Sequence, residues 1–392
     1  MKKLLISSVI AATAAAVNAA PLVTIGDQLD VFFRGAFTGK WDSNVTYSTH
    51  DKINDYAGVF RLGAEADYGR NSKFKANVKF FEDLTRYAEH KEFNSNLAHV
   101  AATAAYVEAN WSVNANFSFD QNYQNTNETL QSDALVRSDA YKAGIVGNYN
   151  FTDKIDGEIG FNWNSTQYTS QWSETYSDND IYSVPVSLLY RVTEKVMVGL
   201  TYSYRHVEFS GGSPWGAINY GDQRDDHFGG ITVRGELLPK LSSTIFFGAT
   251  YRSPSGANTL VSPDGNDSDV TFTANANFNY ELTEKIGLFA NAFRDFGNGA
   301  QRQSSINTGC EVGANYAILS NVTLTSSFSY VNYDYQMGDD REDDNYIARF
   351  GVSYIPNKFI TLGANYRYLC NSSNVDANYN QHLVDFTVMV KY

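Results

Sequence analysis

The chain contains little proline and cysteine, and it has no apolar run long enough to cross a membrane as a helix. Of 392 residues, only 7 are proline and 2 are cysteine, which excludes a disulfide-rich scaffold. After an apolar stretch at the N-terminus, no segment approaches the roughly 18 consecutive apolar residues that a spanning helix needs. A soluble β-protein and a membrane β-barrel both remain open.

Basic residues are also scarce. The sequence has 30 Lys and Arg against 43 Asp and Glu, a formal net charge of −13. Nucleic acid is therefore excluded as a partner, because phosphate binding requires a basic surface. Acidic residues gather in three segments, 222–226, 264–269 and 339–344. Such charge runs favour solvated loops over divalent-cation sites that bridge to lipopolysaccharide. The residue spacing of a calcium-binding loop is missing, and no metal or cofactor is expected.

The N-terminus has the features of an export signal. Lys2 and Lys3 precede an apolar stretch from Leu4 to Val17, and Ala19 ends a run of small residues suited to cleavage. The sequence predicts a signal peptide over residues 1–19 and one exported domain over residues 20–392.

Alternation of apolar and polar residues recurs along the whole exported part. The segments 111–120 and 270–281 are clear examples, and each predicts a strand that is wet on one side only. Short turns such as 152–154 alternate strictly with long polar stretches such as 211–226. This pattern predicts an all-β fold: a transmembrane antiparallel up-and-down β-barrel of about 18 strands, with short periplasmic turns and long extracellular loops.

The last strand ends at the C-terminal residue. From Val384 every second residue is apolar until Tyr392, which resembles the C-terminal signal of bacterial outer-membrane β-barrels that the barrel-assembly machinery reads. We expect this strand to close the barrel by pairing with the first strand near 31–37. The same alternation places Cys310 and Cys370 on the apolar face of strands too far apart for a disulfide, so both thiols are expected to be free.

Residues 41–69 carry a more specific resemblance. Asp42, Asn44 and Asp55 are similar to the opening hairpin of the family called putative β-barrel porin 2, although Ser43 departs from the tighter spacing of that pattern. The resemblance implies a porin-like protein of the outer membrane of Gram-negative bacteria, in contact with lipid and lipopolysaccharide. It leaves a homotrimer open as the assembled form.

The polar face of the predicted strands is where function would lie. Alternation sends the following candidate pore-lining residues inward: Arg34, Arg61, Arg205, Arg234, Arg252, Arg349, Arg367, Glu65, Asp67 and Glu236. One interpretation is that these charges filter solutes. The other is that they pair across strands and serve the wall itself.

The sequence therefore predicts a channel for passive diffusion of small hydrophilic solutes, and not an enzyme. A surface adhesin or a structural barrel without transport is the alternative, because the loops are large. A barrel hydrolase is less favoured. Its only support is the run Asp225-Asp226-His227, where a carboxylate beside a histidine would activate water.

Overall fold

The structure is a computed structural model that describes residues 21–129, 133–212, 221–257, 267–336 and 341–392. The predicted signal peptide lies outside these ranges and remains a prediction. Asp264, Asp339 and Asp340 of the acidic segments also lie outside the described residues. Among the described residues, no helix has the length and apolar character needed to cross a membrane.

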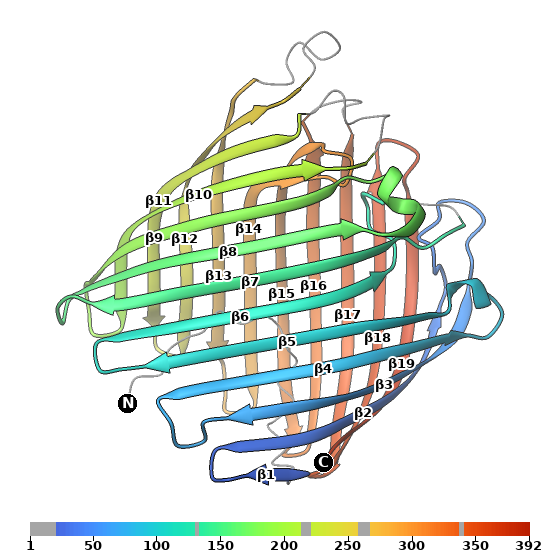
Figure 1. The fold of residues 1–392 in the computed structure, drawn as a ribbon, viewed down its shortest axis with the longest axis horizontal. Coiled ribbons are helices and arrows are strands. Elements are labelled where there is room, and N and C mark those ends of the chain that lie inside the picture. The colour runs from blue at the N-terminus through green and yellow to red at the C-terminus, as the bar shows by residue number, and fades with distance from the viewer. Residues whose placement is uncertain (1–20, 130–132, 213–220, 258–266, 337–340) are drawn as a thin grey trace.

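The strands form one sheet that closes on itself (Figure 1). Each long strand pairs antiparallel with its neighbours in the chain, and β19 pairs with β2 to complete the ring. Besides the short β1 (Val23–Ile25), the described residues form 18 strands, which confirms the predicted barrel and its strand number.

The long strands are β2 (Leu29–Asp42), β3 (Asp55–Tyr68), β4 (Phe74–Tyr87), β5 (Ser95–Val107), β6 (Trp111–Tyr123), β7 (Arg137–Asn150), β8 (Ile155–Tyr168), β9 (Asp178–Arg191), β10 (Val196–Ser210), β11 (Gln223–Leu238), β12 (Leu241–Ser255), β13 (Asp269–Glu281), β14 (Ile286–Asn298), β15 (Ser304–Leu319), β16 (Val322–Tyr335), β17 (Glu342–Asn357), β18 (Ile360–Ser373) and β19 (Tyr379–Lys391). Two short 3-10 helices, η1 (Lys91–Phe93) and η2 (Ser170–Glu174), lie in long connections.

Tight turns join the strands at one rim. Thr152, Thr193 and Thr283 each begin a Thr-acidic-Lys turn. In each, the Thr hydroxyl accepts hydrogen bonds of 3.0–3.2 Å from the backbone N–H groups two and three residues later. The side chain thus satisfies the backbone that the turn leaves unpaired.

The seam of the barrel lies where the sequence predicts it. β19 pairs with β2 over 34–42, which overlaps the predicted segment 31–37 and extends beyond it toward the long-loop rim. Val31 pairs instead with Val23 of β1, so β1 continues the line of β19 below Tyr392. The sequence did not predict β1, because a three-residue strand is too short to show a period of two.

Contacts between strands that are not neighbours identify the inner face. Arg234 on β11 reaches Glu158 on β8 at 3.0 Å, and Arg349 on β17 reaches Glu311 on β15 at 3.3 Å. Such contacts form across the concave side of a curved sheet. The opposite face carries exposed apolar side chains, among them Leu200 and Phe386, 70% and 65% exposed. Free Cys310 and Cys370 also lie on this outer face, as predicted.

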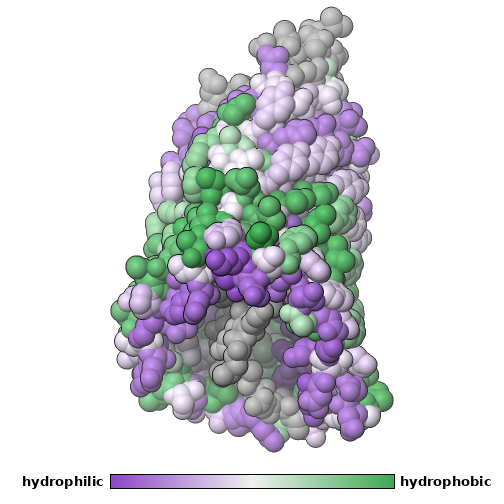
Figure 2. Space-filling view, turned by 90° about the vertical axis from the view of Figure 1, so that its left-hand side faces the viewer, coloured by the Kyte–Doolittle hydropathy of each residue, from purple (hydrophilic) through white to green (hydrophobic). Residues whose placement is uncertain are grey.

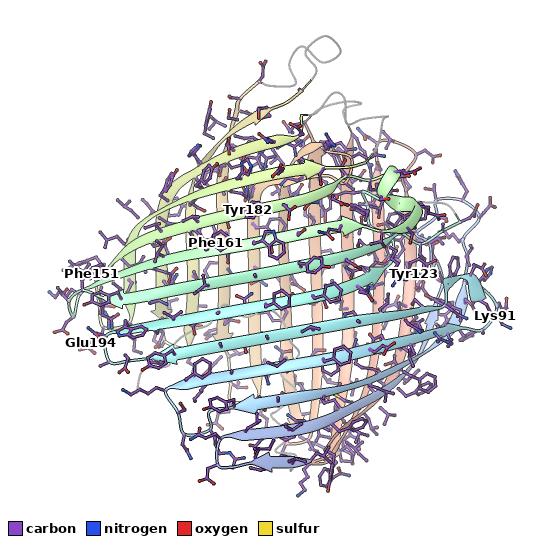
Figure 3. All side chains as sticks on the ribbon, in the orientation of Figure 1. Lys91, Tyr123, Phe151, Phe161, Tyr182 and Glu194 are labelled. Atoms are coloured by element: carbon purple, nitrogen blue, oxygen red, sulfur yellow. The ribbon has the colours of Figure 1, made fainter. Side chains whose placement is uncertain are left out.

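The two rims differ in character. Figure 3 shows Phe151 and Glu194 at the short-turn rim, Lys91 at the other end, and Phe161 and Tyr182 on the outer wall between them. Seen from the short-turn end, hydrophilic residues surround a hollow and apolar residues gather on the outer wall (Figure 2). An apolar outside and a polar inside are the reverse of a soluble protein and match a barrel in lipid.

Candidate functional site: the charged interior and its inward hairpin

Strand pairing places all of the predicted pore-lining residues on the inner face. Their side chains differ in what they contact and in how far they are exposed. These differences separate residues that line the lumen from residues that hold the wall together.

One cluster surrounds Glu65 on β3. Its carboxylate accepts a hydrogen bond from Arg34, and it lies 3.1 Å from the Nζ of Lys391 and 4.0 Å from the Nζ of Lys79. Asn77 donates to both Glu65 and the nearby Asp67. Because Glu65 is only 4% exposed, this cluster fastens β2, β3, β4 and β19 together at the seam.

A second pair is far more open. Arg61 on β3 donates two hydrogen bonds of 2.6 Å to Asp83 on β4, yet 45% of the Arg61 side chain stays exposed. Arg349, paired with Glu311, is also 45% exposed. Among the predicted pore-lining arginines that form ion pairs, Arg61 and Arg349 have the most exposed side chains.

The other predicted residues are engaged within the wall. Arg367 donates to Gln381 at 2.8 Å, and Glu236 lies 2.6 Å from Lys195 at the short-turn rim. Sequence reasoning missed Lys40, which faces inward and donates to the Tyr87 hydroxyl at 3.2 Å. Its place between apolar Trp41 and Gly39 follows the same alternation that identified Arg34.

The wall splits between β13 and β14 near the long-loop rim. β13 pairs with β12 as far as Asp269, but its pairing with β14 stops at Ala274 and Arg294. Beyond this point β14 pairs only with β15, and the hairpin they form bends away from β13 (Figure 1). We call residues 295–305 the inward hairpin, because their contacts lie on the inner face of β10, β11 and β12.

Buried charges hold the inward hairpin in place. Asp226 on β11 bonds Arg205 on β10 and Arg252 on β12, each at 2.7 Å. Arg205 also donates a hydrogen bond to Asp295 of the hairpin at 2.7 Å, and Arg252 donates to the carbonyl of Gly297 at 2.9 Å. The side chains of Asp226 and Arg252 are 2% and 3% exposed. Arg252 therefore presents almost no surface to a solute, although its position on the inner face was correctly predicted.

The tip of the hairpin contacts the connections around it. Arg302 donates to the Ser177 hydroxyl at 3.0 Å and to the carbonyl of Gly211 at 2.7 Å. Ala300, 1% exposed, packs with Val136 and Tyr176. Three neighbouring connections thus close over the tip.

The connection between β6 and β7 completes a bridge across the mouth. Glu128 accepts a hydrogen bond from the backbone N–H of Ala300, and Asn127 donates to Asn371 on β18 at 2.9 Å. Arg341, just before β17, donates to the carbonyl of Asn127 at 2.8 Å. Described residues therefore span the lumen from β10 through the inward hairpin to β18. Sequence reasoning found no signal for this bridge, because a pattern along the chain does not show contacts between segments that are far apart in the sequence.

Docking of Glu128 depends on pH. Burial raises the pKa of Glu128 to about 7, and Arg341 only partly offsets the effect. A carboxyl whose pKa is raised on docking stabilises the docked state fully below its free pKa near 4.5, and this stabilisation is lost as the pH rises to about 7. We expect backbone amides at 124–129 to exchange with deuterium faster at pH 8 than at pH 5, after correction for intrinsic exchange. Glu128→Gln should remove the difference, and an equal difference in that variant would contradict this role.

The run Asp225-Asp226-His227 does not assemble into a hydrolytic site. Alternation along β11 sends Asp226 inward, whereas Asp225 and His227 face outward. Asp225 bonds the Tyr204 hydroxyl and His206, and His227 bonds the Tyr202 hydroxyl. Asp225 and His227 thus bond partners on the outer wall, whereas Asp226 bonds arginines on the inner face, and none of these partners is a Ser or Cys nucleophile.

A closed antiparallel barrel with an apolar outside, a polar inside and alternating short and long connections is a β-barrel of the bacterial outer membrane. Residues 270–392 match the family described as Putative beta-barrel porin 2. The match covers the last strands, whereas the resemblance seen in the sequence lay at 41–69. No curated protein matches the chain.

Solved porins are similar to the chain only at low identity. OpdK of Pseudomonas aeruginosa, in a structure with vanillate, has a TM-score of 0.48 and 9% identity over 93% of this chain and 99% of its own. A BenF-like porin from Pseudomonas fluorescens Pf-5 has a TM-score of 0.46 and 9% identity, with 94% and 100% covered. OccAB3 of Acinetobacter baumannii also has a TM-score of 0.46 and 9% identity, over 93% of this chain and 100% of its own.

Proposed function

We propose that the protein is a channel for passive diffusion of small hydrophilic solutes through a lumen lined by paired charges. The observation that carries this proposal is the partly exposed ion pair on the inner face, represented by Arg61 with Asp83. A structural wall gains little from keeping such a pair in water, since exposed pairs contribute only about 0–1 kcal/mol. A barrel of this strand number is wide enough for an aqueous passage.

Planar lipid bilayers test this function. Purified protein added at low concentration should give stepwise increases in ion conductance, each step marking one inserted barrel. Bilayers that stay sealed at high protein load, with protein inserted and folded, would contradict a channel and leave the adhesin or structural barrel as the better function.

The exposed arginines should set charge preference. Arg61→Gln combined with Arg349→Gln removes the two most exposed guanidinium groups among the predicted pore-lining arginines in ion pairs and leaves Asp83 and Glu311 behind. In a tenfold salt gradient we expect the reversal potential to move toward cation preference by roughly 10 mV, a fraction of the ~59 mV limit for a monovalent ion.

Arg294→Gln serves as the control for this measurement, because Arg294 faces outward and bonds Thr308 at 2.7 Å. It should leave the potential unchanged. A double variant with the wild-type potential would show that Arg61 and Arg349 serve only the wall.

A further inference from the structure

Phe293 breaks the pattern of the barrel wall. The exposed aromatic side chains on the described strands face outward, where lipid covers them, with Phe293 as the exception. Strand pairing places Phe293 on the inner face, and 36% of it is exposed. An apolar ring exposed to an aqueous lumen is unfavourable unless something covers it, which points to a ligand.

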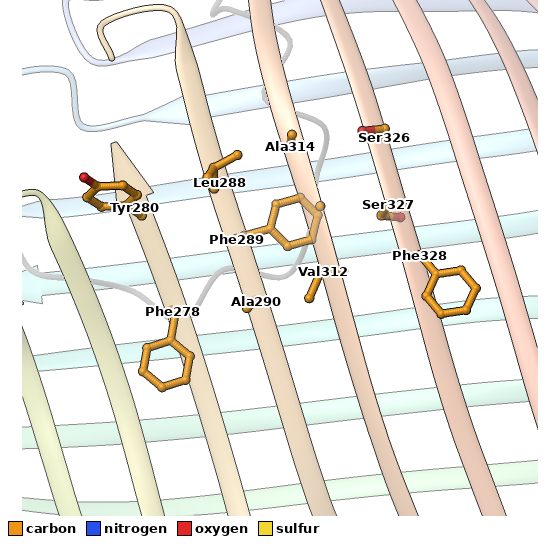
Figure 4. Close-up of a pocket in the computed structure, with 11 residues that line it drawn as sticks. Phe278, Tyr280, Leu288, Phe289, Ala290, Val312, Ala314, Ser326, Ser327 and Phe328 are labelled. Carbon is orange, nitrogen blue, oxygen red and sulfur yellow. The ribbon is translucent and has the colours of Figure 1, made fainter. Parts of the chain in front are cut away.

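Two glycines hold this ring and its neighbour Phe289 against the wall. A Cβ at Gly309 would lie 2.6 Å from the Phe293 ring, and a Cβ at Gly313 would lie 2.2 Å from the Phe289 ring. Both rings therefore rest on β15 where side chains are missing. In Figure 4 the Phe289 ring overlaps β15, whose Val312 and Ala314 side chains point to the opposite face of the sheet. The rings are fixed in orientation before any solute arrives.

Asparagine side chains surround the two rings. Asn275 lies opposite Phe293, Asn279 opposite Phe289, and Asn277 opposite Asn291. Asn277 donates to Asn275 at 2.6 Å, which leaves the remaining amide groups of the set available. A primary amide both donates and accepts, so this set can bond hydroxyl groups in either role.

The local charge is balanced. Glu311 lies opposite Asn291 and pairs with Arg349 at 3.3 Å. No other charged side chain is opposite the two Phe or the four Asn in the strand pairing of the described residues. Asp295, two residues beyond Phe293 on the same face, is likewise paired with Arg205 at 2.7 Å, so the charges next to the rings already have partners and a neutral solute needs no counter-charge here.

The site also lies next to the inward hairpin. Arg294 and Ala274 form the last pair before β14 leaves the wall, and Phe293 is the residue before Arg294. The inward hairpin begins at Asp295. A solute that passes the hairpin on the side of β14 meets these rings next.

We propose that Phe289 and Phe293, with Asn275, Asn277, Asn279 and Asn291, form a binding site for neutral saccharides in the lumen. A sugar ring has an apolar C–H face that covers an aromatic ring and a rim of hydroxyls that bond amides, so it fits both parts of the site. This inference rests on the proposed channel function and adds a solute class to it.

The test measures block of ion current by maltotriose in planar bilayers. Wild-type protein should show concentration-dependent block. Phe293→Ala should raise the half-blocking concentration at least fivefold, with block expressed as a fraction of that variant's own open-channel current, and Phe293→Tyr should restore block. Phe328→Ala is the matched control, because strand pairing places Phe328 (labelled in Figure 4) on the outer face, where 47% of it is exposed, and it should leave block unchanged.

Three results would overturn the saccharide site while leaving the channel intact. They are ion conductance without maltotriose block, equal block in Phe293→Ala, and stronger Phe293-dependent block by benzoate than by maltotriose. A folded, inserted protein that conducts no ions would overturn the channel itself, and with it the site.

Discussion

Arg252→Ala is expected to destabilise the docked inward hairpin by about 3 kcal/mol, because it leaves the buried Asp226 with Arg205 as its remaining partner. It also removes the bonds from Arg252 to Gly297 and Ser304. Since each 1.4 kcal/mol is a factor of ten, backbone amides at 295–305 should exchange with deuterium roughly a hundredfold faster. Hydrogen-exchange mass spectrometry of the protein in lipid discs measures this.

Arg349→Ala is the control for that experiment. It also removes one arginine of an inward ion pair, but Arg349 is 45% exposed and lies away from the hairpin. Exchange at 295–305 should stay at the wild-type rate, since exposed pairs contribute little. Equal protection of the hairpin in Arg252→Ala would show that the buried charges do not hold it.

Shortening the inward hairpin is expected to widen the passage. In a variant where Asn298–Ser304 is replaced by Asn-Gly, a two-residue turn that suits a tight hairpin, the tip no longer reaches Ser177, Gly211 and Glu128. The bridge across the mouth is then broken. We expect the single-channel conductance to rise by roughly twofold or more, because conductance follows the cross-section of the narrowest part.

Deleting Asp376 provides the matched control for shortening a connection. Asp376 lies in the β18–β19 connection at the same rim, and its side chain is 78% exposed. That variant should keep the wild-type conductance. A wild-type step in the shortened-hairpin variant would mean that the hairpin does not limit flow.

The inner face could be predicted because a strand has a period of two. One residue of known orientation fixes the whole strand, so Arg34, Glu65 and Arg349 were placed on the correct face from sequence alone. The partners of these residues could not be predicted. Arg234 meets Glu158 across two intervening strands, and only the curvature of the closed sheet brings them together.

The inward hairpin could not be predicted for a different reason. The alternation of Asp295, Gly297 and their neighbours continues that of β14, so the sequence reads as one unbroken strand. The split from β13 depends on side chains of β10 and β12, which lie far away in the chain. Arg205 and Arg252, two of the predicted pore-lining residues, hold the hairpin at the long-loop rim.

The most direct test of the account uses two adjacent serines on β16. Ser326 faces outward beside Ala314, and Ser327 faces inward beside Gly313. In a background with Cys310→Ser and Cys370→Ser, each is replaced by cysteine and the protein is placed in lipid vesicles with a membrane-impermeant thiol reagent. The account predicts fast labelling of Ser327→Cys, because a water-filled passage reaches it, and almost none of Ser326→Cys. Equal labelling of both positions, or protection of Ser327→Cys, would contradict a wet lumen behind a lipid-facing wall.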